Sequence, residues 1–338
     1  MEEVLQENRT EIESRRELWL DALRGLGILL VVIGHTAPPL AKFVYGFHIP
    51  LFFILSGFLF KPDRFSVVKY LKRLILPYFI LCGINLVIYG VICWGTGEHY
   101  DLPKYIIGIL YSNGTLEWMP NCSPLWYLTC AFVTFLIFAA LLKVKVKWFA
   151  LLGAVTGCGI SYVLYLAGAP KLPWNIDTAM MALIFVYAGY EMRRRDIVGY
   201  LLRRPVFVVL LIVCGSAAIV FNPVAKIDFD YNCYGNLFLM LTGALMVPVA
   251  LFAIFRIVSW DKPVLRIMCW FGKHTILFMG FDYFAGFVAR GIITWLPVKG
   301  WPVALILKIC LLSLIAAICE RVYGKILGPA IKAHSDRV

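Results

Sequence analysis

This 338-residue sequence has few charged residues and lacks the motifs typical of metal sites. Only 15% of its residues are charged against 61% hydrophobic, and the mean hydropathy is +0.82, which excludes an ordinary soluble domain. The ten cysteines form no CxxC pair and no Cys/His spacing typical of a zinc site, so we expect no metal. No internal repeat or low-complexity tract divides the chain, which favours a single domain.

Long apolar runs recur between short polar breaks. A bilayer core about 30 Å thick needs roughly 20 apolar residues per helix, and membrane β-strands would instead be short and alternating. The sequence therefore predicts an all-α, polytopic membrane helical bundle of about ten transmembrane helices. The expected spans are Leu18 to Ala37, Val44 to Phe60, Leu74 to Trp94, Pro124 to Leu142, Trp148 to Gly168, Ile176 to Met192, Pro205 to Phe221, Gly235 to Ile257, Val264 to Arg290 and Pro302 to Tyr323.

Polar tails flank this membrane domain. We assign residues 1–17 to a polar N-terminal tail, residues 18–325 to the membrane domain and residues 326–338 to a C-terminal tail. The first apolar run carries Asp21 and Arg24, and no small-residue cleavage site follows it. We therefore expect the first span to stay in the protein and not to be removed as a signal peptide.

The distribution of Lys and Arg predicts the orientation. If the N-terminus is cytoplasmic, one side receives 23 basic residues and the opposite side 6. Basic residues concentrate on the cytoplasmic side of membrane proteins, so both termini are expected there, in a multi-pass protein of the inner (plasma) membrane. The net charge of +12 then serves topology and contact with anionic membrane lipid, and nucleic acid is not an expected partner.

Arg24 and His35 stand inside the first apolar run, separated by ten residues. An Arg at the centre of a membrane helix costs about 2.5 to 3.5 kcal/mol, so such a residue indicates a functional site. His35 lies about 16 Å further along the helix, close to three turns, and both side chains share one face. Two alternatives remain: an ion pair of Arg24 with Asp21 three residues away, and an interfacial place for His35 at a helix end.

Further polar residues cluster around the next two spans. His48 begins the second span on the side that His35 approaches, which suggests a site with two imidazoles. Ser56 in the same span is a candidate for binding a ligand or for close helix packing. Lys72 and Arg73 precede the third span on the same side as Arg24, where they could receive an anionic phosphate group or simply obey the positive-inside rule.

Two cysteines fall in loops on the predicted outer side. Cys122 and Cys233 could form a disulfide in an oxidising compartment. The remaining cysteines lie mostly within spans, where they act as small hydrophobic residues.

Four segments, in order, resemble one family. They are the Arg24-x10-His35 pattern, FHIPLFFILSGF from Phe47 to Phe58, KRLILPY from Lys72 to Tyr78 and SPLWYL from Ser123 to Leu128. In these segments the chain resembles the integral-membrane acyltransferases that O-acylate carbohydrates, including fucose 4-O-acetylase-like proteins and surface-polysaccharide O-acetyltransferases. The resemblance implies an O-acetyltransferase that takes an acetyl or other short acyl group from cytoplasmic acetyl-CoA (or another acyl-CoA). The acceptor would be a hydroxyl of a cell-envelope or extracellular carbohydrate.

The expected roles follow from the chemistry of each group. An imidazole suits proton removal at neutral pH, so His35 is expected to be the general base, assisted by Arg24 and His48. Cations suit the phosphates of acyl-CoA, which assigns Arg24, Lys72 and Arg73 to the donor, together with Ser56.

One segment departs from the family pattern. WFGKHTILFMGFD, from Trp270 to Asp282, resembles a late Gly-Lys-x-Ser/Thr segment that often ends in His, and here Asp282 stands in that place. Either Asp282 substitutes for that His at the substrate or the role of the His is absent. A charge pair of Asp282 with Lys273 inside the bundle fits equally well. Lys273 and His274 are weaker candidates for the same site.

Carbohydrate contacts are expected on the outer side. Trp126, Asp228 and Asp230 can stack on a sugar or hydrogen-bond to it, although interfacial aromatic residues and polar loops have the same composition. Two other functions fit intramembrane charge as well. They are a proton-coupled exporter of a glycan or acyl intermediate and a non-catalytic membrane sensor.

Overall fold

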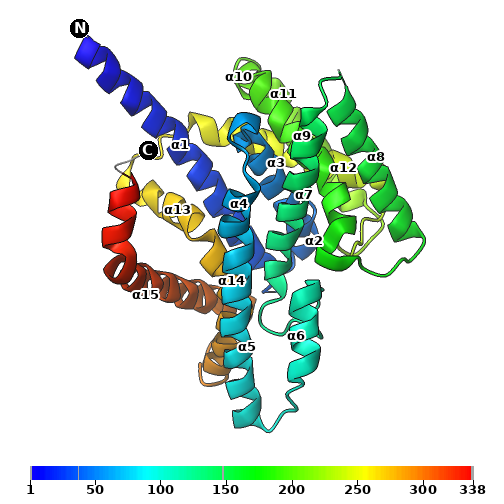
Figure 1. The fold of residues 1–338 in the computed structure, drawn as a ribbon, viewed down its shortest axis with the longest axis vertical. Helices are drawn as coiled ribbons and strands as arrows, with labels where there is room; N and C mark the ends of the chain where they lie inside the picture. Colours follow the sequence, from blue (N-terminus) through cyan, green and yellow to red (C-terminus); the bar gives the residue numbers. More distant parts are fainter. Residues whose placement is uncertain (1, 37, 147, 336–338) are drawn as a thin grey trace.

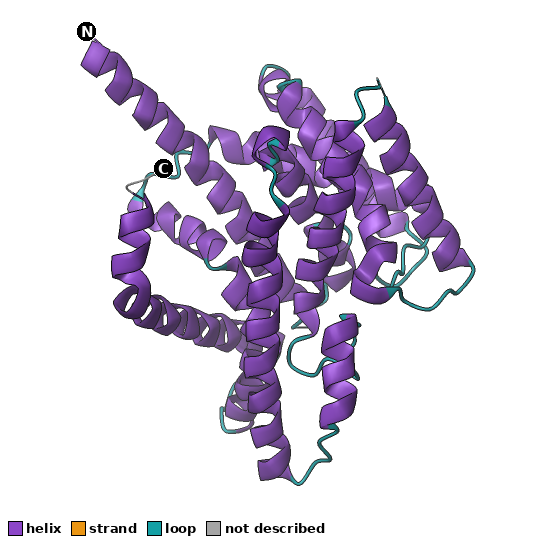
Figure 2. Ribbon diagram, in the orientation of Figure 1, coloured by secondary structure: helices purple, strands orange, loops and turns teal. Residues whose placement is uncertain are grey.

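The structure is a computed structural model that describes residues 2–36, 38–146 and 148–335, and the side chains of residues 18–321 within these ranges. All named elements in these ranges are helical, as Figure 2 shows. The sheet-like pairing recorded there is an isolated antiparallel bridge between Asp228 and Cys233. The predicted all-α class is confirmed.

Within the part of the chain that the structure describes, seven helical segments are long and apolar enough to cross a membrane. They are Ala41–Leu59 (α2, Ala41–Tyr45, and α3, His48–Leu59), Val67–Thr96 (α4, Val67–Tyr70, a π-helical turn Leu71–Ile75, and α5, Leu76–Thr96), Ser123–Lys143 (a 3-10 turn Ser123–Leu125 and α7, Trp126–Lys143), α8 (Phe149–Leu166), α12 (Leu237–Ile257), α14 (Thr275–Thr294) and the Trp301–Arg321 part of α15 (Trp301–Ser335). The chain is thus a multi-pass membrane protein. The count of ten spans and the cytoplasmic termini stay predictions.

The other helices complete the bundle. They are α1 (Glu2–Gly34), α6 (Leu102–Tyr111), α9 (Ile176–Arg194), α10 (Ile197–Leu202), α11 (Pro205–Phe221) and α13 (Pro263–Lys273), with 3-10 turns at Pro62–Arg64 and Pro173–Asn175. One expected span was wrong in extent. The run from Val264 to Arg290 is two helices, because the backbone leaves the helical region at His274, between α13 and α14.

Several helix starts follow from capping residues in the sequence. Ser66, Asp101, Asp196 and Asn236 each accept a hydrogen bond from a backbone N–H three residues further on. These bonds satisfy donors that the first turn of a helix leaves open. The end of α5 is marked by Gly97 in the left-handed conformation, which glycine adopts without strain.

Helix α1 runs from the N-terminus into the centre of the bundle, where it contacts α2, α3, α12, α13, α14 and α15 (Figure 1). Small residues allow the closest helix contacts, as is usual in membranes. A side chain at Gly57 of α3 would collide with the backbone of Val186 in α9, and one at Gly189 would collide with Ile54. The close packing of α3 against α9 therefore requires glycine at both positions. α3 also contacts α1, the helix that His35 follows.

Candidate active site

His35 lies directly after the end of α1, against the middle of α14. Its Nδ1 is 2.8 Å from Oδ2 of Asp282. A carboxylate only accepts hydrogen bonds, so Nδ1 carries the proton and donates it. When the ring is neutral, the other ring nitrogen, Nε2, is an acceptor without a proton, which is the form that a general base needs.

Asp282 has a second partner on α15. Its Oδ1 forms an ion pair with Nζ of Lys308 at 2.9 Å. Both side chains are buried. A buried carboxylate needs such compensation, because an unpaired charge inside a protein is very costly.

A cavity of about 200 Å³, named here the His35 cavity, opens in front of this pair. Its polar and aromatic lining includes His35, Tyr45, His48, Trp126, Lys226, Asp228, Asp230, Tyr231 and Tyr283. The rings of Tyr45 and Tyr283 flank the imidazole of His35, with centroids 6.3 and 5.4 Å from it. His48 is buried and its Nδ1 is 2.9 Å from the carbonyl oxygen of Val44, which holds the ring in the cavity wall.

The loop between α11 and α12 closes one side of the His35 cavity. Its Asn232 is anchored to α9 by hydrogen bonds to Asp177 (2.5 Å) and Thr178 (2.8 Å). In the same loop Lys226 pairs with Asp228 at 2.9 Å, and the carboxylate of Asp230 pairs with Lys171 at 2.5 Å. These contacts fix both carboxylates toward the cavity and leave it with little net charge.

A second cavity, of about 400 Å³ and named here the Arg24 cavity, lies further toward the start of α1. Its charged lining consists of Asp21, Arg24, Arg73 and Lys273, so cations outnumber the one carboxylate. Arg24 Nη1 and Asp21 Oδ1 are 2.6 Å apart, which confirms the ion pair considered from the sequence. This excess of positive charge suits a ligand with several negative charges.

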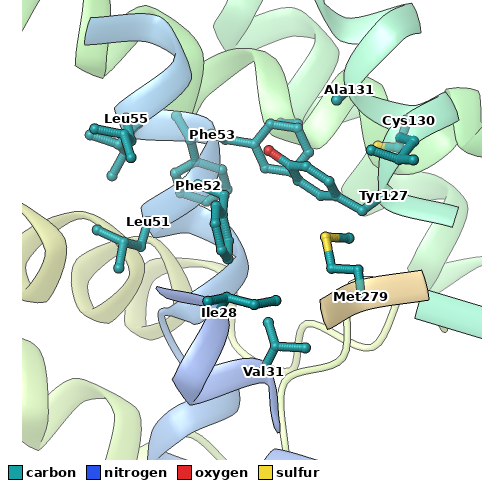
Figure 3. Close-up of a cluster of buried hydrophobic side chains, with 14 of the residues drawn as sticks. Ile28, Val31, Leu51, Phe52, Phe53, Leu55, Tyr127, Cys130, Ala131 and Met279 are labelled. Carbon is teal, nitrogen blue, oxygen red and sulfur yellow. The ribbon is translucent and has the colours of Figure 1, made fainter. Parts of the chain in front are cut away.

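The two cavities share three lining residues, Phe52 of α3, Tyr127 of α7 and Met279 of α14. Figure 3 shows their side chains reaching toward one another from three separate helices, near Ile28 and Val31 of α1. These three side chains therefore border both the cationic cavity and the cavity that holds an imidazole. Such a layout can bring two ligands from separate cavities to one point.

A comparison with protein-family models identifies the chain. The model described as an acyltransferase domain matches residues 17–319, which is most of the sequence. The chain belongs to this acyltransferase family. No curated protein and no solved structure matches it.

The acyltransferase brings most of the sequence-predicted residues to the two cavities. Of the predicted residues, the His35 cavity is lined by His35, His48, Trp126, Asp228 and Asp230. The Arg24 cavity is lined by Arg24, Ser56 and Arg73. Lys72 lies outside both linings and is exposed. Their catalytic and binding roles stay predictions.

Asp282 of the acyltransferase is not part of either cavity lining, because its carboxylate faces His35 and Lys308. Lys273, the partner considered from the sequence, lines the Arg24 cavity instead. Sequence reasoning missed Lys308, although a lysine inside the last apolar run was a signal of a functional site. It also missed Tyr45 and Tyr283, which carried no signal beyond being aromatic.

The two loop cysteines considered for a disulfide, Cys122 and Cys233, are free thiols in the structure. Cys122 is buried, whereas Cys233 takes part in the backbone bridge with Asp228. The α11–α12 loop of the acyltransferase is therefore held by hydrogen bonds and ion pairs.

Proposed function

We propose that this acyltransferase moves an acetyl or other short acyl group from acyl-CoA to a hydroxyl of a carbohydrate. The donor occupies the Arg24 cavity and extends its acylated end past Phe52, Tyr127 and Met279. The acceptor occupies the His35 cavity. The observation that carries the proposal is the pair of cavities that share these three residues, with cations in one and a carboxylate-bound imidazole in the other.

The reaction needs only groups that the chain supplies. Nε2 of His35 takes the proton of the acceptor hydroxyl as its oxygen attacks the thioester carbonyl. The tetrahedral intermediate collapses, the C–S bond breaks and the acyl group stays on the acceptor oxygen. The thiolate of CoA leaves and takes the proton from the imidazolium. Asp282 keeps Nδ1 protonated throughout and stabilises the positive charge that forms on His35.

The lining of the His35 cavity supports a sugar acceptor. Trp126, Tyr45 and Tyr283 offer aromatic faces, while Asp228 and Asp230 accept hydrogen bonds from hydroxyls. The balanced charge of the cavity favours a neutral ligand. With acyl-CoA supplied from the cytoplasm, the acceptor is a cell-envelope or extracellular carbohydrate at the inner (plasma) membrane.

Incubation of the purified full-length protein with radiolabelled acetyl-CoA and a panel of methyl glycosides tests the proposal. We expect labelled ester with wild-type protein and none above background with His35→Gln. Movement of an unmodified glycoside across a liposome membrane would instead indicate the exporter. Binding without turnover would indicate the sensor, and either result would overturn the proposal.

Replacement of the cations in the Arg24 cavity should weaken donor binding. Arg24→Ala and Arg73→Ala each remove a hydrogen-bonding charge, so the acetyl-CoA Kd should rise about tenfold or more. Arg24→Lys should recover only part, because Lys lacks the planar fork that holds two oxygens. Titration calorimetry measures these constants. The matched control is Lys69→Ala, since Lys69 is exposed in α4 and outside the cavity lining. The assignment would be contradicted if all four variants bound acetyl-CoA with the same Kd.

Asp230 should make acceptor binding depend on pH. Burial raises the pKa of this loop carboxyl to about 6, although Lys171 opposes the shift. Above that pH the carboxylate accepts hydrogen bonds more strongly than the neutral acid does below it. The acceptor KM should therefore rise as the pH falls through about 6. Steady-state kinetics of Asp230→Asn should lose this change, and an unaltered pH dependence would exclude Asp230 as its source.

A further inference from the structure

Lys308 is a buried cation that the proposed reaction has not yet used. It lies in α15, and only 4% of its side chain is exposed. A lysine inside a membrane helix is costly, and such residues face the bundle interior and pair with a partner. The partner here is Asp282, at 2.9 Å.

Lys308, Asp282 and His35 are connected by two consecutive contacts that lead from the protein interior to the His35 cavity. Lys308 of α15 contacts Oδ1 of Asp282, and Oδ2 of Asp282 contacts His35. Side-chain exposure rises from 4% and 1% for the ion pair to 15% for His35. Only the imidazole therefore reaches a ligand, and Lys308 can act on the reaction only through Asp282.

We propose that Lys308 is a positioning residue that keeps His35 neutral and oriented, an inference that rests on the proposed function. The ion pair of Lys308 and Asp282 is neutral by itself, so the buried cluster is electrically balanced when the imidazole carries no charge. Without Lys308 the cluster holds one net negative charge, and a proton bound by Asp282 or His35 would neutralise it. Either proton abolishes the arrangement in which Nδ1 donates and Nε2 accepts.

Gly286 leaves space for the side chain of Lys308 beside Asp282. It lies one helical turn after Asp282 in α14. A Cβ atom built on it would stand 3.5 Å from Nη1 of Arg290, and 3.6 Å from Cε and 3.7 Å from Nζ of Lys308. Those are ordinary contact distances, so alanine fits at this position. A larger side chain would occupy the space of the lysine and separate it from the carboxylate.

Two pairs of variants test the inference by kinetics. Lys308→Met should lower kcat on the order of 10- to 100-fold, the loss seen for outer partners of imidazoles in metal sites. The KM values and the acetyl-CoA Kd should stay within about twofold, because Lys308 touches neither cavity. Lys308→Arg, which keeps the cation, should retain a larger share of kcat. Gly286→Leu should lose kcat as Lys308→Met does, and Gly286→Ala should not.

Nitrogen NMR of protein labelled in its histidine rings gives a readout that needs no turnover. The His35 signal, assigned by its loss in His35→Gln, should report a neutral ring with the proton on Nδ1. In Lys308→Met this signal should change to a charged ring or a mixture of tautomers. An unchanged His35 signal together with wild-type kcat would overturn the inference. The inference would also be overturned if Lys308→Met and Lys308→Arg lost kcat to the same extent and both lost donor binding.

The same measurements separate the two proposals. If the wild-type protein forms no labelled ester, the proposed function fails, whereas the tautomer of His35 still reports what Lys308 does. If His35→Gln is inactive and Lys308→Met keeps wild-type kcat with the wild-type His35 signal, only the role of Lys308 fails.

Discussion

His35→Gln should lower kcat by about 10² to 10⁴, the contribution typical of a positioned acid–base group. Glutamine keeps a polar side chain at the end of α1 but cannot take up the proton of the acceptor hydroxyl. Donor binding should stay intact, because His35 does not line the Arg24 cavity. Rates of labelled ester formation and the calorimetric Kd for acetyl-CoA measure the two effects on one preparation.

The control for this variant is that it inserts and folds as the wild-type protein does. His35→Gln should elute from a sizing column in detergent as the wild-type protein does, with the same melting temperature within a few degrees. Turnover close to wild type in such a preparation would exclude His35 as the base. The hydroxyl proton would then have to leave by another group of the cavity.

Asp282→Asn has the second largest expected effect, a loss in kcat on the order of 10² or more. The amide can donate a hydrogen bond to Nδ1, so the imidazole can adopt the tautomer in which Nε2 carries the proton and cannot act as a base. The substitution also leaves Lys308 buried without its counter-charge, so stability should fall as well. Single-turnover rates measure the chemical step, and thermal unfolding in detergent measures the stability.

A double variant separates these two consequences. Asp282→Asn/Lys308→Met carries no buried charge at this position, so its melting temperature should return toward that of the wild type. Its kcat should stay low, because the imidazole still lacks the carboxylate. Recovery of kcat together with stability would show that Asp282 acts through folding and not on His35.

The helices were largely predictable because their signal is local. An apolar run of about 20 residues matches the thickness of a bilayer core and so predicts a membrane-spanning helix. Seven such helices are present in the described residues. The break at His274 was not predictable in the same way. The runs on either side are both apolar, and the packing of α13 along α1 cannot be read from them.

The site was predictable only where its parts are close in sequence or match a motif. Arg24 and Asp21 are three residues apart, so helix geometry alone predicts their contact. His35 and Asp282 are 247 residues apart, and no periodicity links them. The family resemblance marked Asp282 as unusual but could not supply its partners. Lys308 was visible as a charge in a span, yet its pairing depends on the packing of α14 against α15.

Transfer across a sealed membrane tests the central claim that donor and acceptor approach through different cavities. The full-length protein is reconstituted into liposomes in one orientation, with radiolabelled acetyl-CoA on one face and a methyl glycoside accepted in solution on the other. We predict labelled ester only when acetyl-CoA faces the Arg24 end and the glycoside faces the His35 end, and none with His35→Gln. Equal transfer with both substrates confined to the same face would contradict the account.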